Sequence, residues 1–274
     1  MHDPWSVLHV AVLASAGCAA GFINTAAGAG SLVSLRALML LGVPADVANG
    51  TNRLPVLAQS MAAALGFDAK GSLDRKAIWR VALPTTAGAI VGALVASRLP
   101  EHEMRYVLIV VLFVMGLVSL RKTKPKARQT QPARTEGGIG PSDNPPSDSP
   151  DEPAPSGFGF FAALAFAGLY GGFLQAGVGL VLLFALSTVG GYDMIRANAL
   201  KVVVVGIFTV AALAVFVVSG KVDYAAGAIM SVGSVTGARL AVAYAMGHAE
   251  KLKRFAVLVD AVACAVLLYR EWAG

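Results

Sequence analysis

The chain has 274 residues, of which 56% are hydrophobic and only 14% are charged, whereas soluble domains carry about 25% charged residues. This composition excludes an ordinary soluble protein, and the long apolar segments predict an all-α integral membrane protein rather than an outer-membrane barrel. The formal net charge of +6 does not indicate nucleic-acid binding, because the basic residues stand at segment ends and in one linker.

The chain consists of one unit written twice. Adding 149 to each residue number aligns residues 21–42 with residues 170–191, and the register continues without a gap beyond them. Glycines, asparagines and basic residues recur at matching positions, among them Gly28 and Gly177, Gly30 and Gly179, Gly42 and Gly191, Asn49 and Asn198, and Arg105 and Arg254.

Each repeat is predicted to contain five apolar helical segments. In the first repeat they span residues 5–24, 29–41, 45–67, 77–98 and 104–120; in the second they span residues 157–175, 178–189, 194–219, 224–246 and 252–269. The second segment of each repeat would cover roughly 20 Å as a helix, which is less than the roughly 30 Å hydrocarbon core. Segments one and two therefore form either a re-entrant hairpin or a full span followed by a tilted half-helix.

Both arrangements give an odd number of crossings per repeat, so the two repeats are predicted to lie inverted in the membrane. Between segments three and four, the first repeat carries four basic against two acidic residues, while the second carries only Lys221 and Asp223. Between segments four and five the first repeat is balanced, while residues 250–254 of the second carry three basic residues against one acidic residue. Opposite bias in equivalent loops is what the positive-inside rule predicts for an inverted repeat.

Residues 121–156 begin with a basic cluster and then turn to proline, serine and acidic residues. This composition predicts a disordered linker, and its basic start places it in the cytoplasm. The predicted organisation is therefore a first membrane repeat at 1–120, a linker at 121–156 and a second membrane repeat at 157–274. We expect a multi-pass protein of the cell (inner) membrane with both chain ends outside.

A glycine break interrupts each repeat at the start of its short second helix. In lipid, freed backbone groups need partners in protein, water or ligand, and paired breaks in duplicated transporters mark the substrate site. Free N–H groups at a helix start favour an anion; the alternative is that the glycines only permit close helix packing. The substrate-site candidates at the breaks are Asn24, Thr25, Gly28, Gly30 and Ser31 in the first repeat and Gln175, Gly177 and Gly179 in the second.

Polar and basic residues also lie inside the third segment of each repeat. Asn49, Asn52 and Arg53 in the first repeat and Asn198 and Lys201 in the second have spacings that put each set on one helix face. Lys201 aligns with neutral Asn52, so we expect a site that is asymmetric in charge. An ionisable residue inside the membrane is a functional candidate; the alternative for Lys201 is snorkelling to the interface.

Other charged residues lie in apolar segments. Asp260 and Arg239 could meet on adjacent helices, as a structural ion pair or as a proton-coupling pair. Arg36 aligns with Ala185 and either lines the cavity or reaches the surface. Cys18 and Cys264 are read as buried hydrophobes.

The sequence offers no catalytic constellation. The four histidines lie near chain ends, segment ends or loops, and no metal-ligand or nucleophile motif is present. We therefore predict no enzyme activity, no metal and no cofactor. An enzyme embedded in the membrane and a partner-binding membrane subunit are the competing classes.

The repeated unit resembles the sulfite exporter TauE/SafE family of membrane permeases over almost the whole chain. The resemblance is carried by the Gly-x-Gly before a short apolar helix, a turn at Gly42-Val-Pro44 or Gly191-Tyr-Asp193, and an Ala-Asn start to a long helix. It implies a secondary carrier for small sulfur-containing anions such as sulfite or organosulfonates, without an ATPase domain; another small anion is the alternative. The expected partners are the anion, the lipid bilayer and a coupling proton or cation, with a homodimer also open.

Overall fold

The computed structural model describes residues 7–69, 73, 75–120 and 157–244, and every regular element in these ranges is a helix. The helices of the first repeat are α1 (Val7–Ala27), α2 (Ser31–Leu40), α3 (Ala45–Thr51), α4 (Arg53–Ala69), α5 (Arg75–Arg98) and α6 (Glu101–Leu120). Those of the second are α7 (Phe158–Phe173), α8 (Val178–Phe184), the π-helix η1 (Ala185–Val189), α9 (Met194–Val218) and α10 (Tyr224–Tyr244). The predicted linker at 121–156 and the predicted helix at 252–269 lie outside the described residues.

The predicted segments that are described all coincide with helices, and two of them have a changed geometry. The segment predicted at 45–67 is broken at Asn52 into α3 and α4. Pro55 has no N–H to donate to the carbonyl of Thr51, so the normal helical bond cannot form there. The segment predicted at 178–189 changes from α-helix to π-helix at Ala185.

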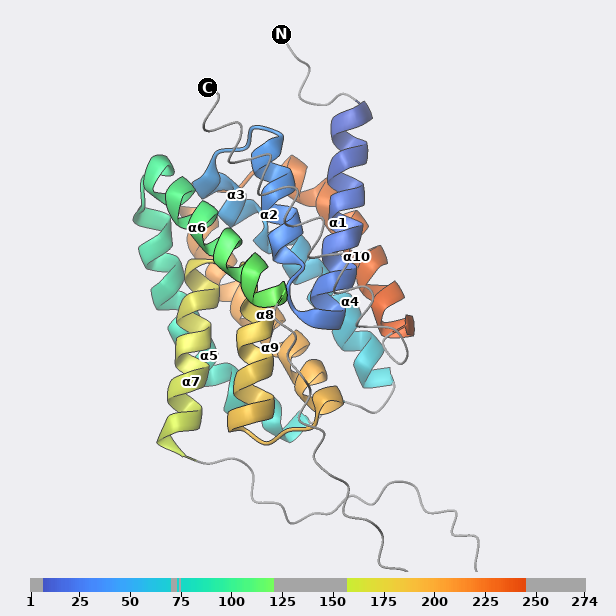
Figure 1. The fold of residues 1–274 in the computed structure, drawn as a ribbon, viewed down its shortest axis with the longest axis vertical. Helices are drawn as coiled ribbons and strands as arrows, with labels where there is room; N and C mark the ends of the chain where they lie inside the picture. The colour runs from blue at the N-terminus through green and yellow to red at the C-terminus, as the bar shows by residue number, and fades with distance from the viewer. Residues whose placement is uncertain (1–6, 70–72, 74, 121–156, 245–274) are drawn as a thin grey trace, which may run out of the picture.

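The first two helices of each repeat are joined by a glycine turn. α2 folds back along α1, with Gly28 between them at a φ of 81° (Figure 1). Gly177, its counterpart, joins α7 to α8 at a φ of 72°. Residues with a Cβ rarely adopt this left-handed conformation, so glycine is needed at both turns.

The first helix of each repeat packs against a helix of the other repeat. In α1, Gly17 lies against Met230 and Gly21 against Ser234, so α1 and α10 run parallel in close contact. Their counterparts behave in the same way: α7 packs against α5, where Gly168 lies against Thr85 and Gly172 against Ala89. A Cβ on Gly21 would lie 2.1 Å from a backbone oxygen, so these backbones approach as closely as small residues allow.

Equivalent long helices of the two repeats run in opposite directions. Gly50, in α3 just before α4, lies against Phe216 near the end of α9, while Gly206 in the middle of α9 lies against Ser60 of α4. The order of contacts is therefore reversed, and α4 and α9 are antiparallel. Both large hydrophobic clusters draw residues from both repeats, so the repeats form one body.

Four described helices are long and apolar enough to cross a membrane. They include the regions His9–Ala27, Arg75–Arg98, Met194–Val218 and Tyr224–Ala243. The chain is thus a multi-pass helical protein with exposed hydrophobic side chains on several helices, including Trp79, Leu83, Phe166 and Val232. Such side chains suit contact with lipid.

Candidate functional site

The two glycine turns meet inside the protein. A Cβ on Gly28 would lie 2.5 Å from the carbonyl carbon of Gly179, and a Cβ on Gly179 would lie 2.4 Å from the Cα of Gly28. The glycine turn at Gly28 therefore touches the start of α8, two residues after the turn at Gly177, with no side chain between the two backbones. The close-packing interpretation of the break describes this contact, which also borders a cavity; the interpretation as a substrate site stays a prediction.

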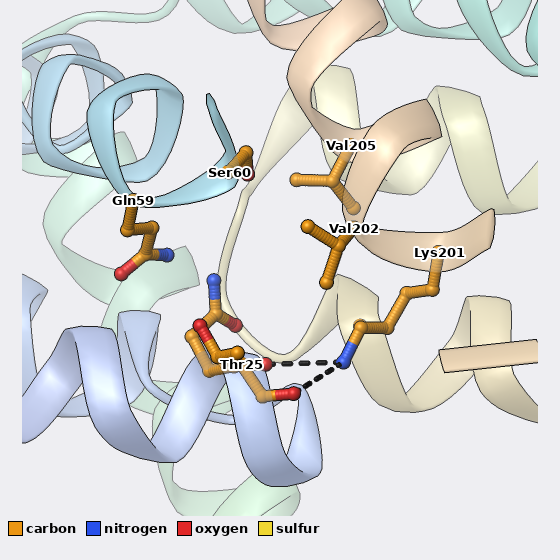
Figure 2. Close-up of a pocket in the computed structure, with 8 residues that line it drawn as sticks. Thr25, Gln59, Ser60, Lys201, Val202 and Val205 are labelled. Atoms are coloured by element: carbon orange, nitrogen blue, oxygen red, sulfur yellow. Dashed lines mark hydrogen bonds between the residues drawn. The ribbon is translucent and has the colours of Figure 1, made fainter. Parts of the chain in front are cut away.

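The cavity lies between α1, α4 and α9, next to the meeting point of the turns (Figure 2). Its space is about 10 Å³, which is room for about one water molecule. Its lining combines polar groups with an apolar wall and consists of Asn24, Thr25, Gln59, Ser60, Gly179, Lys201, Val202 and Val205.

Lys201 brings the one cationic side chain among the described residues that line the cavity. Its side chain is 2% exposed, and its ammonium donates to the carbonyl of Asn24 at 3.1 Å, the carbonyl of Thr25 at 3.4 Å and Oδ1 of Asn198 at 2.6 Å (Figure 2 draws the two bonds to carbonyls). The amide of Asn198 donates to the same Thr25 carbonyl at 3.1 Å. The ammonium is thus held inside the protein, at the end of α1, and does not snorkel.

This position has an electrostatic reason. The last carbonyls of a helix lack intrahelical partners, and together they carry about half a negative charge. The Lys201 ammonium and the Asn198 amide supply the missing donors at the end of α1. A cation can therefore be buried here without a carboxylate beside it.

Arg53 is a second buried cation that donates to the end of a helix, in this case α7 of the second repeat. Arg53 is fully buried and donates from Nη1 to the carbonyl of Gly171 at 3.2 Å and from Nη2 to that of Gly172 at 2.5 Å, at the end of α7. Asn49 donates to the carbonyl of Phe173 at 2.8 Å. The guanidinium also lies 4.4 Å from the ring centroid of Phe216, close enough for a cation–π contact.

The two helix ends are more alike in charge than the alignment indicates, whereas the expected charge asymmetry of the site itself stays a prediction. The alignment compares Lys201 with neutral Asn52, but the cation that acts at the equivalent helix end is Arg53, one residue further along. In each repeat, an asparagine and a cation donate to the last carbonyls of the first helix of the other repeat. Asn49 and Arg53 donate to the end of α7, and Asn198 and Lys201 donate to the end of α1. Of these two helix ends, only the end of α1, which Lys201 contacts, borders the cavity.

The structure places some of the candidate residues from the sequence at the cavity. Asn24, Thr25, Gly179 and Lys201 line it, and Asn198 holds the ammonium. Three other candidates, Asn49, Asn52 and Gln175, are not among the lining residues. Asn49 donates to Phe173, Asn52 Oδ1 accepts from Ser34 Oγ at 2.5 Å, and Gln175 donates to Thr209 at 2.6 Å.

The remaining candidates belong to the turns or lie elsewhere. Ser31 is buried at the start of α2, after Gly30, and Gly177 forms the second turn. Arg36 is buried and donates to the carbonyl of Leu112 in α6 at 3.0 Å, so it neither lines the cavity nor reaches the surface. Arg239 is exposed on α10, and its proposed partner Asp260 lies outside the described residues.

Sequence reasoning missed the α4 side of the cavity. Gln59 and Ser60 are buried and face it from α4, with Gln59 pointing toward the end of α1 in Figure 2. A signal was present, because both are polar residues inside an apolar segment. Val202 and Val205 could not be found in this way, since apolar residues are ordinary in such a helix.

The site joins a fixed positive charge with neutral donors and an apolar wall. The amide of Gln59 and the hydroxyl of Ser60 can donate hydrogen bonds, and the Lys201 ammonium can make a charge-assisted one. This chemistry suits a small oxyanion. Among the described residues no group of three or more His, Cys, Asp or Glu side chains could hold a metal ion.

Comparisons with known proteins agree with a membrane-transport role. Residues 13–268 match the family described as Sulfite exporter TauE/SafE. A probable membrane transporter protein of Haemophilus influenzae is 26% identical over 252 residues, covering 91% of this chain and 90% of the relative. The probable membrane transporter protein YfcA of Escherichia coli is 29% identical over 269 residues, covering 96% of this chain and 91% of the relative. No solved structure matches the chain.

Proposed function

The chain belongs to the sulfite exporter TauE/SafE family of membrane transporters, and from that premise we propose that it is a secondary permease of the inner membrane for small sulfur-containing anions such as sulfite or organosulfonates. The observation that carries the proposal is the buried Lys201 ammonium at the cavity next to the contact between Gly28 and Gly179. The end of α1 offsets only about half of the ammonium's charge, and an anionic substrate at the cavity can offset the rest.

Alternating access between the two membrane faces is the proposed mechanism. Support comes from the antiparallel course of α4 and α9, the positive φ shared by Gly28 and Gly177, and the crossed packing of α1 on α10 and α7 on α5. The antiparallel course of α4 and α9 supports the proposal that the two repeats are inverted. An inverted pair can rock about a central site and expose it to one face at a time.

The narrow cavity fits this mechanism. A space of about 10 Å³ does not accommodate an oxyanion, so loading requires α1, α4 and α9 to separate. The Lys201 ammonium has three N–H groups and three acceptors. An anion that enters therefore replaces one of these acceptors, which couples substrate binding to release of the α1 end.

Flux into proteoliposomes tests the proposal. Purified protein should raise the uptake of sulfite or methanesulfonate above that of empty vesicles, and Lys201→Met should abolish most of the increase. Arg75→Gln is the matched control, because Arg75 is a cation at the exposed start of α5, paired with Asp68 at 2.7 Å. Equal flux through vesicles with and without protein, for all small sulfur-containing anions, would overturn the proposal.

A further inference from the structure

The cavity at Lys201 carries a charge balance that restricts its substrate. Resting on the proposed function, we propose that the site selects singly charged anions with an apolar face, such as short alkanesulfonates, over dianions such as sulfate. The inference concerns the number of charges and the shape of the ligand, whereas the function proposed above requires only that it be anionic.

The positive charge at the cavity is no more than about one unit. Among the described residues that line it, Lys201 is the one cation, and Gln59 and Ser60 are neutral donors. The end of α1 offsets part of the ammonium, since a helix C-terminus carries about half a negative charge. Arg53 is not among the lining residues, and its guanidinium donates to the end of α7. The remaining positive charge is about half a unit, so one anionic charge comes close to balance, while a second would be buried without a partner, which is costly.

The shape of the lining agrees with an anion that has one apolar face. Lys201, Gln59 and Ser60 present donors, while Val202 and Val205 form a hydrocarbon wall from the neighbouring turns of α9 (Figure 2). The oxygens of a sulfonate can accept hydrogen bonds from these donors while its alkyl group packs against the two valines. Sulfate would place a charged oxygen against those methyl groups, where it finds no donor.

The lining also disfavours substrates that carry a positive group. No carboxylate is present among the described residues at the cavity. An aminosulfonate such as taurine would bury its ammonium with the Lys201 ammonium nearby and no counter-charge. Ethanesulfonate, which lacks the amine, should bind better than taurine.

Methanesulfonate and sulfate form a matched pair for the test. They are tetrahedral and of similar size, and they differ by a methyl group in place of a charged oxygen. Affinity for the full-length protein should be measured by isothermal titration calorimetry at equal ionic strength, because sulfate also stabilises proteins by exclusion from their surface and would distort a thermal screen. We expect methanesulfonate to bind at least roughly tenfold more tightly than sulfate, since an unpaired buried charge costs more than one charge-assisted bond.

A variant tests whether the lining is the cause. Gln59→Lys adds a second cation to the cavity, and it should shift the ratio of affinities toward sulfate; Ser60→Lys is the second choice of position. A folded variant with an unchanged ratio would overturn the assignment of selectivity to this lining. The wild-type ratio decides the proposal even if neither variant folds.

The outcomes separate this inference from the proposed function. Sulfate binding as tight as that of methanesulfonate, with flux of both, would overturn the selection of single charge and leave the permease intact. Absence of binding and flux for every small anion would overturn both. Tighter binding of methanesulfonate than of sulfate by the wild type, together with weakened binding and flux of methanesulfonate in Lys201→Met, would support both.

Discussion

Replacement of Lys201 by methionine is the most informative single change in this protein. Methionine keeps the unbranched apolar stem and removes the ammonium. The change has two separable consequences, one for the stability of the fold and one for anion affinity. Both can be worked from the contacts of the ammonium.

The stability cost follows from the acceptors that lose a donor. The carbonyl of Asn24 still accepts from the N–H of Gly28 at 2.9 Å, and that of Thr25 still accepts from the Asn198 amide at 3.1 Å. Only Oδ1 of Asn198 loses the donor that the structure gives it at 2.6 Å. One buried acceptor without a partner costs about 1–3 kcal/mol, so Lys201→Met should lower the free energy of unfolding by about that amount and still fold.

The effect on affinity has a different origin. A charge-assisted contact contributes about 1.5–3 kcal/mol, which corresponds to a loss of roughly ten- to a hundredfold in affinity. Lys201→Arg keeps the charge, but the planar guanidinium does not fit three acceptors arranged for an ammonium, so we expect a poor rescue.

Arg53→Met is the matched control for this change. It removes the equivalent buried cation from the end of α7, which does not border the cavity. Both variants should unfold at lower temperature than the wild type, and calorimetric titration of the folded protein should show reduced anion affinity in Lys201→Met alone. Wild-type affinity in Lys201→Met, or equal losses in the two variants, would refute the role of Lys201 in binding.

Three further predictions address the fold. If the repeats are inverted, cysteines placed at Lys76 and at Ser219, in a background without native cysteines, should be labelled from opposite sides of the membrane; labelling from one side would contradict the inversion. Gly21→Ala puts a Cβ 2.1 Å from a backbone oxygen of α10, so it should destabilise the fold by about 1–3 kcal/mol or more, seen as loss of monodisperse protein in size-exclusion chromatography. Asp46→Asn removes the carboxylate that lies 3.1 Å from the ammonium of Lys221, in a pair whose side chains are 13% and 19% exposed. The free energy of unfolding should fall by about 1–3 kcal/mol, between the values for exposed and buried pairs. Thermal unfolding measures this, and an unchanged midpoint would show that the pair contributes nothing.

The helical segments and part of the site could be predicted from the sequence because each has a local signal. The length of the apolar segments predicted the helices, and the glycine break predicted the turn at Gly28 and its counterpart at Gly177. Lys201 stood out as a charge inside an apolar segment. Those signals depend on one stretch of chain at a time, and the repeat supplies the same signal twice.

The α4 side of the cavity could not be predicted with the same ease. Gln59 and Ser60 are neutral residues, which are common in membrane helices as local hydrogen-bonding groups. Their significance depends on the packing of α4 against α9 and the end of α1, which brings together residues far apart in the chain. The segment at 45–67 was predicted as one helix, although polar residues interrupt its apolar pattern around Asn52 and Pro55 marks the place where the helical bond is lost.

The two capping cations show why alignment of the repeats misleads at single residues. Asn49 and Asn198 align, and each donates to the end of the other repeat's broken helix. The cation follows at i+4 in the first repeat, as Arg53, and at i+3 in the second, as Lys201. Spacings of i+3 and i+4 place side chains on one face of a helix. The long stems reach carbonyls near a helix end from either position, those of Gly171 and Gly172 for Arg53 and those of Asn24 and Thr25 for Lys201. The requirement for a cation at each helix end is therefore met in both repeats, although the aligned positions hold Val202 opposite Arg53 and Asn52 opposite Lys201.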